Sequence, residues 1–346
     1  MMAQREHFAP DELAVVLSHY DVGIIESARE FARGSRQSPK LLLAAPTGRY
    51  LLKRRAAGRD KPERVEFTHA LLRHLHERGF SVPRLVTTRD GQTLVTHQNR
   101  VYEVFEFLDG QRYSESLGET THAGRTLARF HHHAAELDTG WQPVASSFHD
   151  LSSVKSGLNS IPTTVASHDS VVGHEAELLS TTQELYERYE DAAAKAGELG
   201  FLEWRQTINH GDWHPGNMLF SHDKVCVVLD FDAVRPAPRV CDIANGLLQF
   251  SILRSAGDPI DWPDFFDLTR MRRFFRGYLT RLPLTPAQRE ALPHLIIESA
   301  IAECVHPIAA TGSLGQLQGY GVLMMLKRKV RWLADKLPEM LRWMLD

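Results

Sequence analysis

The chain has 346 residues and a formal net charge of −3, and 43% of its residues are hydrophobic. This composition excludes intrinsic disorder, because the apolar surface is sufficient to offset the entropy lost on folding. The near balance of 40 basic and 43 acidic residues argues against a protein that binds nucleic acid through bulk positive charge. At roughly 150 residues per domain, the length predicts two domains or lobes.

The cysteine content and the N-terminal segment indicate the cellular compartment. Cys226, Cys241 and Cys304 are too few and too scattered for a disulfide framework, and none belongs to a CxxC pair. The N-terminal segment lacks the basic and apolar regions of a signal peptide, and no run reaches the roughly 18 apolar residues of a membrane-spanning helix. We therefore expect a protein of the reducing cytoplasm with neither a membrane nor a nucleic acid as partner.

The first hundred residues have a mostly β pattern. Two short apolar runs within 40–55 flank Thr47 and Gly48 and predict a hairpin. Apolar residues at helical spacing predict a helix over 62–79, and 83–110 contains three extended runs separated by turn signals. This order of elements predicts a small sheet that carries one helix.

After residue 110 the pattern becomes mostly helical. In chain order it predicts a helix over 119–137, a loop over 139–165, a polar helix over 174–198, short extended runs around a loop over 204–232, and helices from 241 onward that end in an amphipathic one at about 319–345. The change places the boundary near 108–111, with an N-lobe of residues 1–108 and a C-lobe of 109–346. The predicted fold class is therefore α+β, with a β-rich N-lobe and an α-rich C-lobe.

The most informative segment is 208–248, INHGDWHPGNMLFSHDKVCVVLDFDAVRPAPRVCDIANGLL. Asp212 and Asn217 are five residues apart across a loop that Pro215 and the following glycine make tight. A buried strand then leads to Asp230, thirteen residues after Asn217. A hairpin between Asn217 and Asp230 brings their oxygen atoms to the same end of a sheet, which suits Mg²⁺ that also holds phosphates.

This is the layout of phosphoryl transfer in kinases, where a loop Asp meets the nucleophile, an Asn and a later Asp hold the metal, and a strand Lys contacts the phosphates. Asp212 is then predicted to accept a proton from a hydroxyl or to orient it. Asn217 and Asp230 are the predicted metal ligands. Asp232 is a further candidate for the metal or for catalysis, with a structural role equally open. Lys53, in the predicted third strand, is expected to contact the phosphates.

With these residues in place, the chain resembles the aminoglycoside phosphotransferase, choline kinase and homoserine kinase-like family, whose signature is H-G-D-x-H-P-G-N followed by D-F-D. The resemblance covers about residues 22–310. It implies a two-lobed protein-kinase-like fold, with ATP and Mg²⁺ as cofactors. It also implies transfer of the ATP γ-phosphoryl group to a hydroxyl of a small molecule. Amino alcohols, aminoglycosides, homoserine and sugars all stay open as acceptors, and the oligomeric state is not predicted.

The resemblance also implies two nucleotide contacts. In such folds the linker between the lobes supplies backbone hydrogen bonds to adenine, and here that linker is Glu106-Phe107-Leu108. A glycine-bearing turn covers the phosphates, and here that turn contains Gly34 and Ser35.

The resemblance also implies roles for two further positions. Asp242 matches a family acid that braces the catalytic loop. Kinases pair the strand Lys with a Glu on the following helix, and that position falls here at Thr68. Glu66 is the nearest acid and is the candidate partner of Lys53. The alternative is that this ion pair is absent.

Several readings stay open at this stage. A protein kinase is disfavoured because no Ala-Pro-Glu signal follows D-F-D. A catalytically silent binding or structural protein is disfavoured by the intact motif, and GTP could replace ATP. Glu298 and Glu303, in an apolar C-terminal helix, could face a cationic substrate or be ordinary polar positions.

Overall fold

The computed structural model describes residues 5–31, 34, 37–165 and 171–346. It divides into two compact units, each discontinuous in sequence. The first unit comprises Met1–Arg112, His133–Val144 and Asn217–Val234, and the second comprises Tyr113–His132, Ala145–Gly216 and Arg235–Asp346. The chain first passes between the units close to the expected boundary at 108–111, but the segment that contains D-F-D returns to the first unit.

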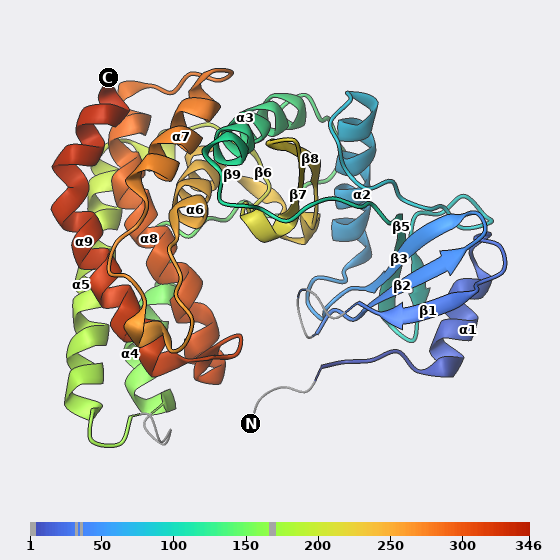
Figure 1. Cartoon of the computed structure of the whole chain (residues 1–346), viewed down its shortest axis with the longest axis horizontal. Coiled ribbons are helices and arrows are strands. Elements are labelled where there is room, and N and C mark those ends of the chain that lie inside the picture. The colour runs from blue at the N-terminus through green and yellow to red at the C-terminus, as the bar shows by residue number, and fades with distance from the viewer. Residues whose placement is uncertain (1–4, 32–33, 35–36, 166–170) are drawn as a thin grey trace. The chain divides into compact units, whose positions relative to one another are not determined.

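The first unit contains a five-stranded antiparallel sheet with the strand order β1-β2-β3-β5-β4 (Figure 1). The strands are β1 (Ser27–Glu30), β2 (Lys40–Ala45), β3 (Gly48–Arg54), β4 (Val95–His97) and β5 (Arg100–Glu106). The hairpin predicted within 40–55 is confirmed as β2 and β3. Of the three extended runs expected in 83–110, the last two form β4 and β5. The first makes isolated bridges at Leu85 and Thr88 instead of a strand.

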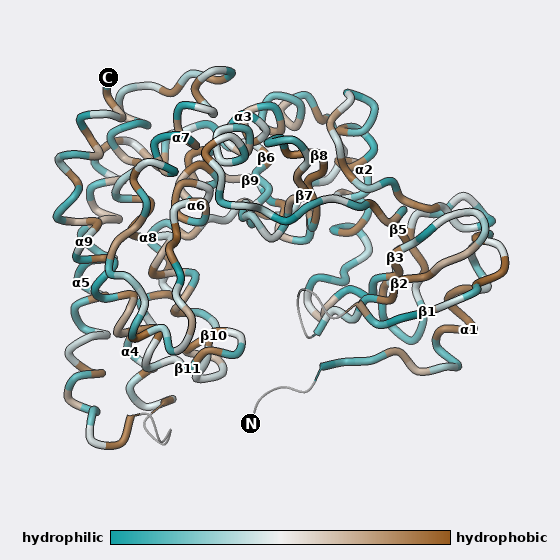
Figure 2. The backbone as a smooth tube through the Cα atoms, in the orientation of Figure 1, coloured by the Kyte–Doolittle hydropathy of each residue, from teal (hydrophilic) through white to brown (hydrophobic). Residues whose placement is uncertain are grey.

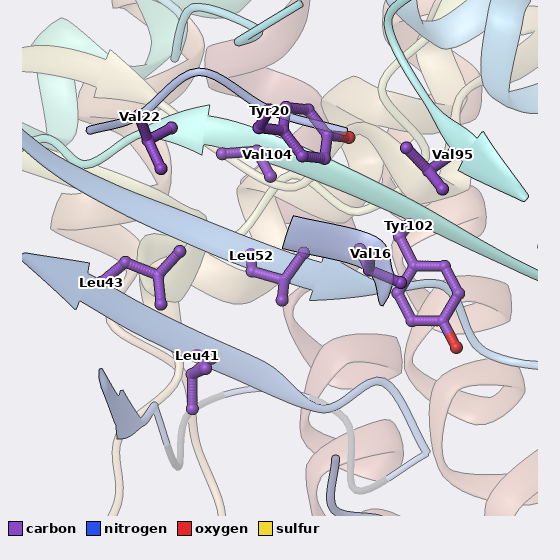
Figure 3. Close-up of a cluster of buried hydrophobic side chains, with 9 residues drawn as sticks. All are labelled: Val16, Tyr20, Val22, Leu41, Leu43, Leu52, Val95, Tyr102 and Val104. Carbon is purple, nitrogen blue, oxygen red and sulfur yellow. The ribbon is translucent and has the colours of Figure 1, made fainter. Parts of the chain in front are cut away.

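One face of this sheet forms a hydrophobic core, which α1 (Pro10–Ser18) helps to cover (Figure 3). The core side chains are those of Val16, Tyr20, Val22, Leu41, Leu43, Leu52, Val95, Tyr102 and Val104. Successive side chains of a strand point to opposite faces, so Leu52 in the core places Lys53 on the other face. By the same alternation, Glu103 lies between two core residues of β5 and also points away from the core.

Helix α2 (Pro62–Glu77) confirms the helix predicted over 62–79. Pro62 occupies the first turn, where its missing N–H costs no hydrogen bond, and Gly79 with φ +69° follows the helix end. Besides its apolar residues, the buried side of α2 carries Thr68 and His69. Polar groups therefore enter the interior of the first unit from this helix.

A second hairpin of the first unit carries the D-F-D motif at its end. Strand β7 (Met218–Ser221) pairs with β8 (Lys224–Val228) through a turn at His222 and Asp223, both with positive φ. Such left-handed residues match the right-handed twist of the two strands. The Val228 amide donates to Ser81 O at 3.1 Å, so the hairpin is bonded to the segment that follows α2. Short 3₁₀ turns flank it at Pro215–Asn217 and Phe231–Ala233.

The second unit is mostly helical. Its helices are α3 (Leu117–Ala134, whose last residues belong to the first unit), α4 (Ser152–Val165), α5 (Glu175–Glu198), α6 (Val240–Ser251), α7 (Leu268–Leu279), α8 (Pro286–Thr311) and α9 (Gly319–Leu345). Strand β6 (Gln206–Asn209) pairs with β9 (Arg235–Pro238), and β10 (Ser313–Leu314) pairs with β11 (Leu317–Gln318). Helices α5, α8 and α9 pack side by side, and hydrophobic and hydrophilic residues recur along each of them (Figures 1 and 2).

The predictions for 119–137, 174–198 and 319–345 are confirmed as α3, α5 and α9. The loop predicted over 139–165 is wrong for its second half, where α4 forms. The frequent serines and threonines of this segment suggested a loop, but Val154, Leu158, Ile161 and Val165 are buried along one side of the helix. Their spacing of three or four residues is typical of an amphipathic helix, and it indicates a helix here despite the polar composition of the segment. Along the described residues, no helix combines the length and the apolar character needed to span a bilayer.

Candidate active site

Lys53, near the end of β3, lies among three carboxylates and is 5% exposed. Its Nζ atom is 2.5 Å from Asp232 Oδ1, 3.4 Å from Asp230 Oδ1 and 3.7 Å from Glu103 Oε1. Burial disfavours the charged ammonium, but the carboxylates of Asp230 and Asp232 outweigh it and raise the pKa of Lys53. Lys53 is therefore a buried cation held among carboxylates.

Glu103, on β5, is a fully buried partner of Lys53 that the sequence analysis missed. The two residues are directly opposite in the β3–β5 register, so their side chains leave the same face of the sheet. The Glu103 carboxylate also accepts a hydrogen bond from Arg55 Nη2 at 2.9 Å and lies 2.8 Å from His69 Nε2. Burial raises the pKa of Glu103, but Arg55 and His69 outweigh it and hold that pKa well below its usual range. Glu103 is therefore ionised and joins Lys53 to Arg55.

The prediction that Glu66 pairs with Lys53 is wrong. Glu66 is exposed on α2, and the carboxylates near Lys53 among the described residues come from β5 and the D-F-D segment. Thr68, at the expected position, donates its hydroxyl to Arg64 O at 3.0 Å within its own helix. Two residues rotate a helical side chain by about 200°, so Glu66 does not share the buried side of Thr68. The charge partner of Lys53 is supplied across the sheet rather than by the helix.

Lys40, on β2, is a second lysine close to Asp230 that the sequence analysis missed, and it is partly buried. It is opposite Lys53 in the β2–β3 register, and its Nζ lies 3.5 Å from Asp230 Oδ2. Burial and the neighbouring Lys53 lower the pKa of Lys40. Gly34 has φ +85°, a left-handed conformation that favours glycine, and a Cβ atom there would be 2.9 Å from Lys40 Nζ. The expected phosphate turn thus approaches Lys40 at Gly34, while Ser35 is outside the described residues.

The segment expected to contact adenine follows β5. The Glu106 amide donates to Arg84 O and the Phe107 amide donates to Arg49 O, each at 2.9 Å. Both amides are therefore engaged within the first unit. Leu108, the third residue of the segment, is partly exposed.

Asn217 and Asp230 flank the open end of the β7–β8 hairpin, as the spacing predicts. The Leu229 amide donates to Asn217 O at 2.8 Å, which ties the two ends together immediately before Asp230. Asp230 has φ 57° and ψ 75°, a left-handed conformation that is rare outside glycine and is concentrated at functional sites. An amide oxygen and a carboxylate at one strand end are a hard donor set that suits Mg²⁺, which keeps several waters.

Asp232 is placed differently from the other two predicted metal ligands. Its Oδ1 atom is 2.5 Å from Lys53 Nζ and 2.6 Å from Arg55 Nη1, and its side chain is 9% exposed. The carboxylate is therefore occupied by two cationic side chains, whereas the Asp230 side chain is 30% exposed. Among the described residues, no three His, Cys, Asp or Glu side chains form a metal-binding group. The residues that fit a metal here are Asn217 and Asp230.

The catalytic-loop motif lies in the second unit, directly after β6, where Asp242 holds its backbone. The buried Asp242 carboxylate accepts hydrogen bonds from the His210 amide at 2.6 Å and the Gly211 amide at 2.9 Å. His131 Nε2, on α3, is 3.2 Å from the same carboxylate. Burial raises the pKa of Asp242, but His131, His210 and the Gly211 amide together outweigh it, so the net pKa is lowered. The expected brace of the loop is therefore present.

Asp212 is the exposed acid of this loop. Half of its side chain is accessible, and its Oδ2 atom lies 3.5 Å from His214 Nε2. The Gly216 amide donates to His214 Nδ1 at 3.0 Å, so Nδ1 is the acceptor and Nε2 carries the hydrogen. The hydrogen-bearing Nε2 of His214 therefore faces the Asp212 carboxylate.

The two acids of α8 have different surroundings. Glu298 is fully buried, lies 3.0 Å from His149 Nδ1 and accepts the Asp150 amide at 3.0 Å, so it joins α8 to the start of α4. Glu303 is partly exposed and accepts hydrogen bonds from Asn245 and Gln249 of α6. Of the two, Glu303 is the one that a ligand can reach.

Comparison with known proteins agrees with this geometry. The family model described as "Phosphotransferase enzyme family" matches residues 27–292. A homoserine kinase of Rhodopseudomonas palustris is 27% identical over 323 residues, covering 87% of this chain and 84% of that protein. Among solved structures, an aminoglycoside phosphotransferase of Alicyclobacillus acidocaldarius has a TM-score of 0.68 at 20% identity, covering 97% of this chain and 98% of that one.

A microcompartment-associated aminopropanol kinase has a TM-score of 0.70 at 18% identity and covers 94% of this chain and 96% of that chain. These likenesses confirm the predicted protein-kinase-like α+β fold. The chain is a small-molecule kinase, and the match over residues 27–292 shows that it belongs to the phosphotransferase enzyme family.

Proposed function

We propose that this protein transfers the γ-phosphoryl group of ATP to a hydroxyl group of a small amino alcohol, with Mg²⁺. The observation that carries the proposal is the row of Lys40, Lys53 and Glu103 across three strands, with Asp230 beside both lysines. A buried and a partly buried lysine on one sheet, next to an acid that suits a metal ion, are suited to a triphosphate.

Each residue then has a defined part in the reaction. Lys53 and Lys40 bind phosphate oxygens, and Asn217 and Asp230 hold Mg²⁺, which neutralises charge on the phosphates when bound. Asp212 accepts the proton of the acceptor hydroxyl while that oxygen forms its bond to the γ-phosphorus. The bond between the γ-phosphorus and the bridging oxygen breaks, and ADP leaves with the electron pair. Asp232 and Glu103 keep Lys53 and Arg55 in position, and Leu108 contacts adenine.

The acceptor class is supported by the relatives. One acts on homoserine and another on aminopropanol by their names, and both molecules carry an amino group and a hydroxyl group. Their shared chemistry favours an amino alcohol over a sugar.

The test is ADP release and phosphoryl transfer from labelled ATP, measured with Mg²⁺ on a panel of amino alcohols, sugars and diols. We expect transfer to at least one amino alcohol, and its loss in Asp212→Asn. Asp335→Asn, an exposed acid of α9, is the matched control and keeps full activity. Phosphoryl transfer that survives in both Asp212→Asn and Asp230→Ala contradicts the proposal. A preference for GTP over ATP contradicts the part of the proposal that names the nucleotide.

A further inference from the structure

Lys53, Arg54 and Arg55 are consecutive basic residues at the end of β3, and they alternate between the two faces of the sheet. The Arg55 amide donates to Val101 O at 2.9 Å, so the pairing with β5 continues one residue beyond β3. Side chains two residues apart in a strand leave the same face, so Arg55 shares the face of Lys53. Arg54 takes the other face, where its Nη1 atom lies 2.6 Å from Glu12 Oε1. The reaction outlined above gives Arg55 no task of its own.

Lys53 and Arg55 contact the same two carboxylate oxygen atoms. Asp232 Oδ1 is 2.5 Å from Lys53 Nζ and 2.6 Å from Arg55 Nη1. Glu103 Oε1 is 3.7 Å from Lys53 Nζ and 2.7 Å from Arg55 Nε. Two cations and two carboxylates therefore alternate in a closed ring, and none of the four side chains is more than 9% exposed.

The carboxylate of Glu103 is held in this ring by further contacts. Its Oε2 atom accepts a hydrogen bond from Arg55 Nη2 at 2.9 Å and lies 2.8 Å from His69 Nε2. The other ring nitrogen of His69 is 2.8 Å from Thr93 Oγ1. Glu103 is therefore fixed by contacts that do not involve Lys53.

The ring lowers the attraction of the two carboxylates for Lys53. An oxygen atom that is shared between two cations attracts each of them less than an oxygen atom that serves one. This matters most in a buried site, where the low local dielectric strengthens the attraction of an uncompensated charge. A lysine ammonium has three N–H donors, and a phosphate must compete with the carboxylates for them. Arg55 weakens the competing carboxylates.

We propose that Arg55 is a positioning residue for Lys53, which shares Asp232 and Glu103 with the lysine and so leaves the ammonium group available to a nucleotide phosphate. An arginine suits this place because its planar fork contacts two carboxylates at once, which the single ammonium of a lysine does not. The inference rests on the proposed function, because it takes Lys53 as a residue that binds a phosphate of ATP. It adds a side chain that acts on the nucleotide through its neighbours.

The test is the affinity for Mg·ATP, measured by titration calorimetry together with kcat and the KM for ATP. In Arg55→Met, Asp232 is left to Lys53 alone and draws it away from the phosphate. We expect the Kd for Mg·ATP to rise by at least about tenfold, the worth of one charge-assisted hydrogen bond. The KM for ATP rises in parallel, while kcat at saturating ATP changes less.

Arg54→Met is the matched control, because Arg54 is a buried arginine of the same strand that contacts Glu12 and Glu6 on the opposite face. Both substitutions lower the melting temperature, since each leaves buried carboxylates without a partner. Only Arg55→Met is expected to change the Kd for Mg·ATP. An equal rise of this Kd in both variants overturns the inference, because it indicates a general loss of structure.

Two further variants keep the test decisive if Arg55→Met does not fold. Arg55→Met combined with Asp232→Asn removes the competing carboxylate with its partner, and its Kd for Mg·ATP is expected to be close to that of the wild type. Arg55→Lys keeps the positive charge without the planar fork, and it is expected to bind Mg·ATP more weakly than the wild type. Unchanged affinity in Arg55→Lys, or weak binding in the double variant, overturns the inference.

Binding and transfer together separate this inference from the proposed function. Binding of Mg·ATP that depends on Arg55, without phosphoryl transfer to any acceptor, supports the inference and contradicts the proposed reaction. Phosphoryl transfer with the same Kd for Mg·ATP in Arg55→Met and the wild type contradicts the inference and supports the reaction.

Discussion

Lys53 and Glu103 are direct cross-strand neighbours on β3 and β5, with Lys53 Nζ 3.7 Å from Glu103 Oε1. The acid that accompanies Lys53 therefore belongs to the same sheet as the lysine. Arg55 contacts both oxygens of that carboxylate, and His69 Nε2 lies 2.8 Å from Oε2. The position of Lys53 is accordingly set by strand register, and not by the placement of α2.

Replacing Glu103 tests this relationship. Glu103→Gln removes a buried negative charge that faces Arg55 and Lys53, and we expect it to destabilise the protein by about 3 kcal/mol, as when one partner of a buried ion pair is lost. In the folded fraction the KM for ATP rises, because Lys53 turns further toward the aspartates. Urea unfolding and the KM for ATP measure the two effects. Glu66→Gln is the control, and equal effects of the two substitutions contradict the assignment.

The two acids of D-F-D are expected to respond differently to removal of charge. Asp230→Asn raises the Mg²⁺ concentration needed for half-maximal activity and changes the melting temperature little, because the Asp230 side chain is 30% exposed. Asp232→Asn lowers the melting temperature, because it leaves Lys53 and Arg55 without their nearest carboxylate at 9% exposure. Magnesium titrations and thermal melts of both variants make the comparison. The same magnesium dependence in both variants argues for a metal role of Asp232.

Loss of the loop brace is expected to reduce turnover. Asp242→Asn replaces an acceptor of two backbone amides, those of His210 and Gly211, by an amide group with one acceptor oxygen. We expect a fall in kcat of at least about tenfold with a smaller change in the KM for ATP, because Asp212 loses its fixed position. Steady-state kinetics with both substrates varied decides this, and a change confined to the KM for ATP contradicts it.

Glu303 predicts a pH dependence of stability. A carboxyl group whose pKa is raised from 4.5 to about 7 binds its proton more tightly in the folded state. Its contribution to stability is therefore greatest at low pH and is lost as the pH rises from 4.5 toward 7. The groups that face it are Asp212, His214 and the neutral amides of α6. Thermal melts between pH 5 and 8 are expected to show Glu303→Gln gaining relative to the wild type, and a constant difference argues against an ionising Glu303.

The parts of the site that the sequence predicted are those that one short segment encodes. Asp212, Asn217 and Asp230 lie within the H-G-D-x-H-P-G-N and D-F-D segments, where chain connectivity alone limits the geometry. The ends of the β7–β8 hairpin meet as the spacing indicates, because the Leu229 amide bonds to Asn217 O. The roles proposed for these residues remain predictions until the variants are measured.

The parts that were missed depend on pairing between distant segments. Glu103 becomes the partner of Lys53 through a register that joins residues fifty apart, and a charged residue between Tyr102 and Val104 was the available signal. The kinase pattern instead places the acid on the helix that follows the lysine strand, and Glu66 is the nearest acid to that position. Helix α4 was missed because its polar composition concealed a buried stripe that packs against α8.

The division of the chain into two compact units separates the residues proposed to bind the nucleotide from the residue proposed to meet the acceptor. Lys40, Lys53, Asn217 and Asp230 belong to the first unit, whereas Asp212, only one peptide segment upstream, belongs to the second together with Glu303. Under the proposed function, substitutions in the second unit can therefore alter the choice of acceptor while every residue proposed to bind the phosphates or Mg²⁺ stays the same.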